Sequence, residues 1–307
     1  MTKSEITFDV TYDCNLNCPF CSTDPNPTLA QMPWDVVEAC LNFIQLAKQS
    51  YRQMTTVVVS GGEPLLRTDL AQIIKIWNSK ADKMILCTSG SVETEQEYWN
   101  NLSSCGLGSV RLSLHRVSPD MCRNLFGPEY SLATVQKTIT AINEAGLVLD
   151  LNYVLNKRSA AHLRDVFSFA ADHRVRKVRV LGLARQGRAA LNWDSLEVSR
   201  ECEKAIIAKA KELSSEHRIA VELAGLSGAN WCSHSDAEGN CQGGKTFFHI
   251  TTSGDIYPCP GVKALAWHKM GSVLQPAQVK SIFDHRDRET KCLVLSEAKQ
   301  LCLKENN

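Results

Sequence analysis

Short β-rich apolar runs alternate with longer segments of helical periodicity over the first 223 residues. The densest run, at residues 55–60, is almost entirely β-branched and predicts a strand buried on both faces of a sheet. Residues 33–49 carry apolar side chains at helical spacing behind a proline, which suits the first turn of a helix. The same patterns predict further strands at residues 6–12, 84–88, 110–115, 148–154, 178–183 and 219–223. They predict intervening helices at residues 69–77, 94–102, 131–145, 160–173 and 196–215.

This alternation contains about six β/α repeats and predicts an α/β fold with a parallel sheet. Eight repeats would close a full TIM barrel, so six indicate either an open, partial (β/α)6 TIM-like barrel or a doubly wound sheet. Both architectures bind their ligands at the carboxyl ends of the strands. Functional residues are therefore expected in the loops that follow the strands.

The pattern changes after residue 223. Residues 224–244 are rich in Gly, Ser and Asn and carry few periodic apolar positions. Two short β-rich runs, at 247–251 and 255–257, flank a Thr-Ser-Gly turn and predict a hairpin with Gly254 in its turn. Two further helices are predicted, at 279–283 and 291–303. We therefore divide the chain into a barrel, residues 1–223, and a small α+β extension, residues 224–307.

Composition excludes several classes of protein. The chain is 44% hydrophobic and 22% charged, which is ordinary for a globular protein with a sizeable core. Its formal charge of +1 gives no overall indication of a nucleic-acid partner, and a short basic cluster at residues 174–179 is interpreted as a solvated edge. No apolar run approaches the ~18 residues that cross a bilayer, and the N-terminus lacks the apolar region of a signal peptide. We therefore expect a cytoplasmic protein without membrane contact.

Thirteen cysteines are the unusual feature, and an odd number does not suggest a disulfide framework. Cys14, Cys18 and Cys21 follow the first predicted strand within eight residues. Three thiolates in one loop can bind three irons of an iron–sulfur cluster and leave the fourth iron open for a substrate or cofactor. A structural zinc site is the alternative, but zinc usually takes four ligands and no fourth cysteine lies nearby in the sequence.

The spacing C-x3-C-x2-C, with the aromatic Phe20 before the last cysteine, resembles the signature of the radical S-adenosylmethionine (SAM) superfamily. The resemblance implies a partial barrel and a [4Fe-4S] cluster on the three cysteines, with SAM chelated by the open iron. An electron from a donor such as flavodoxin or ferredoxin would cleave SAM to methionine and a 5′-deoxyadenosyl radical. That radical would abstract a hydrogen atom from the substrate, and the protein would position the substrate and shield the radical.

Other residues at strand ends agree with this resemblance. Gly61, Gly62 and Glu63 belong to a Gly-Gly-Glu-Pro stretch after the second strand. In the superfamily this stretch holds the amino group of SAM, and two glycines allow a close backbone approach to a ligand. The family also places ribose and carboxylate contacts at later strand ends, although such polar residues are often satisfied within their own loops. The corresponding candidates here are Ser113, Asn152 and, as partner of the SAM carboxylate, Arg185.

The extension resembles the start of the SPASM and twitch domains, in which a glycine lies between two cysteines as Gly254 does here. The longer SPASM continuation is missing, so the resemblance implies the shorter twitch form with a second, auxiliary [4Fe-4S] cluster. Free thiols are the alternative. The expected ligands are Cys232, Cys241 and Cys259, with Cys292 preferred over Cys302 as the fourth.

Some epimerases of the superfamily use a cysteine that binds no metal to return a hydrogen atom to the substrate radical. Cys122 and Cys302 are the candidates for that role, while His115 is expected to serve either the substrate or the structure. The remaining four cysteines are expected to be structural: Cys40, Cys87, Cys105 and Cys202.

These features predict a radical SAM enzyme that modifies a peptide or peptide-like natural product by epimerisation, crosslinking or oxidation. The first strand begins near residue 6 and leaves no room for an N-terminal domain that grips a leader peptide. A dehydrogenase or epimerase of a sugar, aminoglycoside or nucleotide therefore stays as the alternative. A non-catalytic iron–sulfur or regulatory protein is a second alternative, from another class.

Overall fold

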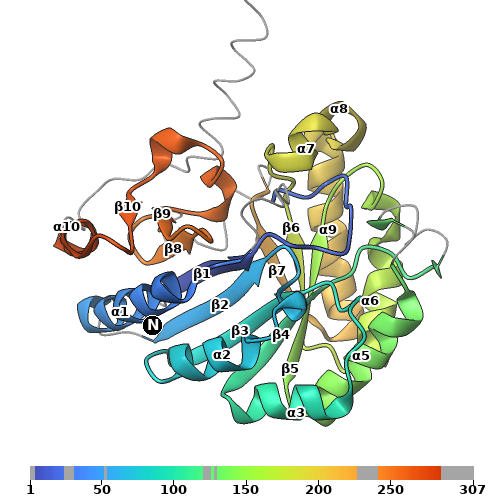
Figure 1. Cartoon of the computed structure of the whole chain (residues 1–307). Helices are drawn as coiled ribbons and strands as arrows, with labels where there is room; N and C mark the ends of the chain where they lie inside the picture. The colour runs from blue at the N-terminus through green and yellow to red at the C-terminus, as the bar shows by residue number, and fades with distance from the viewer. Residues whose placement is uncertain are drawn as a thin grey trace, which may run out of the picture.

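The computed structural model describes residues 4–23, 31–51, 54–119, 126–127, 130–226 and 241–284. Consecutive strands pair in parallel from β1 to β7, which confirms the α/β alternation expected of a partial barrel (Figure 1). Strand β2 is buried along its first five residues, as its β-branched sequence predicts. The strands are β1 (Ser4–Thr11), β2 (Thr55–Gly61), β3 (Lys83–Thr88), β4 (Leu107–Ser113), β5 (Val148–Val154), β6 (Lys177–Leu181) and β7 (Ala220–Ala224).

Helices connect the strands and cover one face of the sheet (Figure 1). Helices α5 and α9 begin at serines whose hydroxyls accept a hydrogen bond from a backbone amide of the first turn. Two short helices, α7 (Gly187–Leu191) and α8 (Trp193–Leu196), follow β6. The longer helices are α1 (Trp34–Tyr51), α2 (Leu70–Asn78), α3 (Gln96–Ser104), α5 (Leu132–Glu144), α6 (Leu163–Asp172) and α9 (Arg200–His217). No described helix is long and apolar enough to cross a membrane.

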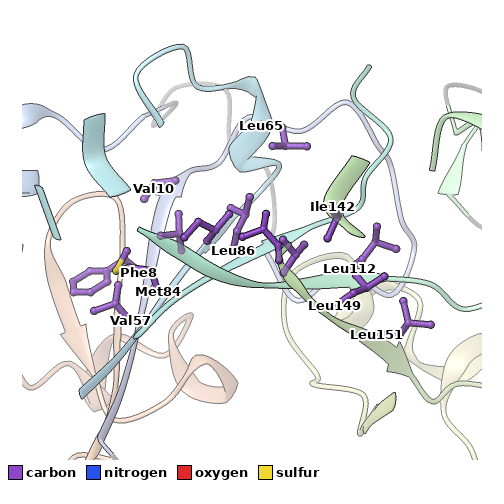
Figure 2. Close-up of a cluster of buried hydrophobic side chains, with 14 of the residues drawn as sticks. Phe8, Val10, Val57, Leu65, Met84, Leu86, Leu112, Ile142, Leu149 and Leu151 are labelled. Carbon is purple, nitrogen blue, oxygen red and sulfur yellow. The ribbon is translucent and has the colours of Figure 1, made fainter. Parts of the chain in front are cut away.

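The helix-covered face of the sheet is apolar. Phe8 on β1 packs against Trp77 of α2 with ring centroids 4.5 Å apart. Its neighbours on the same face are aliphatic, and Figure 2 shows them gathered along the neighbouring strands. The labelled members of this cluster on the strands are Phe8, Val10, Val57, Met84, Leu86, Leu112, Leu149 and Leu151.

The opposite face of the sheet is polar and charged. Arg111 on β4 donates two hydrogen bonds to Glu5 on β1, at 3.0 and 2.9 Å, although β2 and β3 lie between these strands. Side chains stand nearly perpendicular to a sheet, so two that meet across two strands require the sheet to curl around them. The inner face of the partial barrel is therefore a polar interior, unlike the apolar core of a closed TIM barrel.

The extension continues the barrel sheet at the β1 edge, opposite the edge formed by β7. Strand β8 (Phe247–Ile250) pairs in parallel with β1 and antiparallel with β9 (Asp255–Tyr257), which confirms the predicted hairpin. Gly254 in its turn has φ +81°. Strand β10 (Gly271–Ser272) ends the sheet, and α10 (Pro276–Asp284) confirms the first predicted tail helix. The second, at 291–303, lies outside the described residues, and the division of the chain at residue 223 stays a prediction.

Candidate functional site

The loop after β1 carries the three cysteines at the carboxyl end of the strand. Residues 12–17 and Arg188 line a cavity of about 350 Å³ beside it. The loop turns on itself, because the Cys21 amide donates to the Cys18 carbonyl at 3.2 Å and the Leu16 amide lies 3.4 Å from Cys14 Sγ. All three thiols are partly buried. The structure thus places the cysteine triplet in the loop at the end of β1, as the sequence predicts, with Cys14 lining the cavity.

The thiols suit metal binding better than free thiolate chemistry. Burial raises the pKa of Cys14 to about 11 and also raises that of Cys18, so both are protonated near neutral pH without a metal. A bound metal removes these protons. No three His, Cys, Asp or Glu side chains in the described part of the chain are grouped to hold a single ion. Cys14 and Cys21 lie close enough to Cys18 for their charges to raise its pKa further. Thiolates are the ligands that iron–sulfur clusters take, so the donor set fits such a cluster.

Gly61 and Gly62 lie where the backbone at the end of β1 leaves no room for a side chain. The Gly62 amide donates to the Thr11 carbonyl at 2.7 Å, and the Glu63 amide donates to the Asp13 carbonyl at 2.8 Å. A Cβ atom at Gly62 would lie 2.2 Å from the Asp13 oxygen, and one at Gly61 would lie 2.1 Å from the Thr11 oxygen. The sequence predicts that these glycines admit a ligand. The structure shows that they admit the backbone that leads into the cysteine loop.

The Glu63 carboxylate accepts four hydrogen bonds from the protein. The donors are the Thr88 hydroxyl, the Leu65 amide and both the amide and hydroxyl of Ser89, at 2.6 to 3.1 Å. Burial raises the pKa of Glu63 while these four donors oppose the rise. Four bonds fill the lone-pair positions of a carboxylate. Glu63 therefore joins the ends of β2 and β3, and its expected contact with the SAM amino group stays a prediction.

A chain of hydroxyl groups connects Glu63 to the cysteine loop. Ser89 Oγ lies 2.8 Å from Ser91 Oγ, which accepts a hydrogen bond of 3.0 Å from the Asn15 amide group. Asn15 lies between the first two cysteines of the triplet. The sequence reasoning missed both serines, although the polar stretch at residues 88–91 directly follows a buried strand and was a usable signal.

Phe20 lies against a buried histidine at the end of β4. The His115 ring meets Phe20 edge-on at 4.8 Å, and its Nδ1 accepts a hydrogen bond from the Val154 amide at 3.0 Å. Burial lowers the pKa of His115 to about 3, so the ring is neutral. Of the two expected roles for His115, these contacts favour the structural one.

Ser113 and Asn152 pair with each other at the carboxyl ends of β4 and β5. Asn152 Oδ1 accepts a hydrogen bond of 3.0 Å from Arg179, whose Nε donates to Glu222 at 2.9 Å. Arg179 is only 6% exposed, so the interpretation of the basic cluster as a solvated edge is wrong for this residue. The alternation of β6 directs it into the polar interior, where Asn152 and Glu222 pair with it. The expected SAM contacts of Ser113 and Asn152 stay predictions.

Two arginines after β6 lie in different places. The Arg185 guanidinium lies over the Trp193 ring at 5.5 Å. Arg188, on α7, lines the cavity and donates from Nε to the Cys18 carbonyl at 2.9 Å. Arg188 is thus a cation that the structure brings to the cysteine loop beside the cavity. The expected contact of Arg185 with the SAM carboxylate stays a prediction.

Two tail cysteines lie on adjoining segments. A Cβ atom at Gly243 would lie 3.3 Å from Cys241 Sγ and 3.1 Å from the Pro258 carbonyl oxygen, so the segment after Cys241 packs beside the one that leads to Cys259. Cys40 is buried on α1 as predicted. Cys87, Cys105 and Cys202 are partly exposed. The other candidates lie outside the described residues: Cys122, Cys232, Cys292 and Cys302.

A curled parallel sheet with three cysteines after its first strand defines a class of enzymes that bind an iron–sulfur cluster at the mouth of a partial barrel. The model of the radical SAM superfamily matches residues 8–170, more than half of the chain, and the chain belongs to this superfamily. It is an enzyme of the radical SAM type. Its cofactors are the [4Fe-4S] cluster and SAM that this superfamily uses.

Two curated relatives are PqqA peptide cyclases. The chain is 25% identical to that of Granulibacter bethesdensis over 267 residues, which covers 86% of this chain and 70% of the relative. It is also 25% identical to that of Xanthomonas axonopodis pv. citri over 263 residues, covering 85% of this chain and 68% of the relative.

Two solved structures share the fold. Streptococcus suis SuiB bound to its precursor peptide SuiA has a TM-score of 0.74 at 15% identity, covering 95% of this chain and 68% of SuiB. The enzyme anSMEcpe with bound SAM has a TM-score of 0.69 at 14% identity, covering 93% of this chain and 82% of its own. At these identities the likeness concerns the fold alone.

Proposed function

We propose that this enzyme modifies a peptide or peptide-like natural product by radical SAM chemistry. The observation that carries the proposal is the extent of the match to the PqqA peptide cyclases. Its 267 residues are more than the 223 residues assigned to the barrel, so the likeness continues into the extension. The extension lies beside the cysteine loop, because β8 pairs with β1. A substrate at the mouth of the barrel would lie beside both.

When bound, the cluster and SAM supply a radical that removes a hydrogen atom from the substrate. The chain holds them through its own residues. Cys14, Cys18 and Cys21 would bind three irons, and Arg188 places a positive charge beside the cysteine loop, where it favours anionic ligands. Glycine close contacts and the hydroxyl chain from Glu63 fix this loop before any ligand arrives. Such preorganisation is the main contribution that a protein makes to cofactor chemistry.

We further propose a second [4Fe-4S] cluster in the extension. The adjoining segments of Cys241 and Cys259 support it, and Cys232 with Cys292 or Cys302 would complete the ligand set. Such a cluster could take up the electron that a substrate radical loses on net oxidation. The proposed donor for the first cluster is a flavodoxin or ferredoxin in the cytoplasm, where thiols are kept reduced.

The SAM chemistry is tested on the anaerobically reconstituted protein. The wild type is expected to form 5′-deoxyadenosine from SAM only when reductant is present, and Cys14→Ala, Cys18→Ala and Cys21→Ala should each abolish it. About eight irons per chain support two clusters, while about four with cleavage intact would remove the auxiliary cluster. Iron binding without any SAM cleavage would favour the non-catalytic alternative.

The substrate class needs its own experiment. Synthetic peptides encoded by short reading frames beside the gene are incubated with the reduced enzyme and SAM. Crosslinking or oxidation should lower the peptide mass by two hydrogens, and epimerisation in deuterated water should exchange one hydrogen for one deuterium. A sugar oxidised or epimerised under the same conditions, with every peptide unchanged, would favour the small-molecule alternative.

A further inference from the structure

One buried glutamine joins the two cysteine-bearing loops. Gln186, just before α7, is 5% exposed. Its Nε2 donates to the Pro260 carbonyl at 3.2 Å, and its Oε1 accepts from the Ala264 amide at 2.9 Å. Both partners belong to the turn that directly follows Cys259. One side-chain amide therefore fixes both ends of this tail turn.

The same segment also fixes the other loop. Arg188 donates to the Cys18 carbonyl at 2.9 Å, and the Ala189 amide donates to the Cys21 carbonyl at 3.1 Å. Gln186 therefore bonds the tail turn, while Arg188 and Ala189 bond the cysteine triplet. The two bonds to the triplet belong to no helix and to no pair of strands.

A second buried contact joins the same two regions. Lys263, inside the tail turn, donates to Asp9 on β1 at 2.7 Å and to Thr23 at 2.6 Å. Thr23 lies two residues after Cys21, and its carbonyl lies 2.8 Å from Cys21 Sγ. Asp9 is 1% exposed and also lies 3.0 Å from His249 Nε2 on β8.

These contacts do more than attach the extension. Apolar packing already attaches it, since Phe283 on α10 packs against Phe43 on α1 at 5.1 Å. A buried ion pair repays little of its desolvation cost, and apolar residues of similar volume are often as stable. Its distinctive contribution is geometry, because hydrogen bonds fix direction and distance.

We propose that Gln186 is a positioning residue. Its two hydrogen bonds to residues 260 and 264, here called the clamp, act with the Lys263 contacts to hold the tail turn against the cysteine loop, so that the tail turn supports that loop. A change at the tail turn, such as metal binding at Cys259, would then alter SAM affinity, and SAM would alter the tail turn in return. The inference rests on the proposed use of Cys14, Cys18 and Cys21 as the cluster site.

The test compares two glutamines in the full-length, cluster-loaded protein. Gln186→Ala removes the clamp. Gln96→Ala is the matched control, because the Gln96 side chain also makes two hydrogen bonds, donating to Asn100 and to the Ala141 carbonyl, far from the site. Hydrogen exchange is measured in peptides covering residues 14–23 and 260–264. The Kd for SAM is measured by equilibrium dialysis, and iron and sulfide are determined for each variant.

Gln186→Ala is expected to speed exchange in both loops and to weaken SAM binding about 3- to 10-fold with iron content unchanged. Gln96→Ala should leave both loops and the Kd as in the wild type. Faster exchange at 260–264 alone, with an unchanged Kd, would reduce Gln186 to local packing of the tail. A wild type that binds no SAM would overturn the proposed function, and the exchange in residues 14–23 would still decide whether the clamp exists.

Discussion

The two cysteine-bearing loops of this enzyme are held by different means. The loop of the cysteine triplet rests on the backbone of the Gly-Gly-Glu-Pro stretch, so its support comes from residues that a sequence motif contains. The turn after Cys259 is held by Gln186 and Lys263, which bond partners 74 and 254 positions away. Both arrangements join segments far apart in the chain and form only when the sheet assembles. The residues of the first belong to a recognisable motif, whereas no motif marks Gln186 or Lys263.

The largest effect is expected where the triplet loop rests on glycine. Gly62→Ala places a Cβ atom 2.2 Å from the Asp13 carbonyl, which must move and carry the loop with it. A displacement of about 1 Å can cost on the order of 100-fold in rate, so 5′-deoxyadenosine formation should fall by about that factor. The control is Gly108→Ala, where the nearest atom lies 3.7 Å away. Equal losses in both variants would contradict the assignment.

The turn after Cys259 is tested by Lys263→Met. Burial alone would raise the pKa of Asp9, and the contacts with His249 and Lys263 hold it far below its usual range. Burial lowers the pKa of His249, so that ring is neutral at pH 7 and Lys263 is the charged partner. Removing that partner strands a buried charge, which should lower the free energy of unfolding by about 3–5 kcal/mol at pH 7.

The loss of unfolding free energy in Lys263→Met should become smaller as the pH falls. The wild-type pair stabilises the fold above the ordinary Asp pKa of about 4 and loses that contribution as pH falls toward the depressed pKa of Asp9. The difference between Lys263→Met and wild type in urea unfolding should therefore shrink at about pH 3.5. Lys48→Met, which breaks an exposed pair with Asp82, should cost less than about 1 kcal/mol. A pH-independent deficit in Lys263→Met would reject the explanation.

A smaller effect separates the two arginines after β6. Arg188→Ala removes the cation from the cavity and its bond to Cys18, and should weaken SAM binding by about 10- to 100-fold, as for other charged hydrogen bonds. Arg185→Ala should weaken it less, because that guanidinium lies over Trp193. Dialysis against labelled SAM checks both. A larger loss at Arg185 would support the expected contact of that residue with SAM and contradict the role assigned to Arg188.

The smallest effect is expected outside both loops. Cys105 is partly exposed at the end of α3, with its thiol 3.9 Å from Asn101 Oδ1. Cys105→Ser should change the free energy of unfolding by less than about 0.5 kcal/mol and leave iron and sulfide content as in the wild type. Loss of iron in this variant would show that the division of the cysteines into ligands and bystanders is wrong.

The fold was largely accessible from sequence because the strands β1 to β6 each bury an apolar face. Phe8, Val57 and Leu86 fall on that face by simple alternation. The cysteine triplet was accessible because its three cysteines are neighbours in the chain. The hydroxyl chain through Ser89 and Ser91 was not, because its members and Asn15 meet only when β1, β2 and β3 lie side by side.

The polar interior was harder to predict for the same reason. Arg179 lies in a run of basic residues that resembles a solvated edge, and only the pairing of β5, β6 and β7 gives it Asn152 and Glu222 as partners. The place of the extension was also hidden. A hairpin can be inferred from turn chemistry at Gly254, but its pairing with β1, more than 200 residues earlier in the chain, cannot.

The sequence by itself determined the α/β alternation and the position of the cysteine triplet at a strand end, because both depend on periodicity and short spacing. The tertiary structure decided that Arg188 lies beside the cysteine loop, why two glycines follow β2, and how the tail turn meets the cysteine loop. Each of those depends on close contacts between segments far apart in the chain. Such contacts arise only when the sheet curls and brings β1, α7 and the tail turn together.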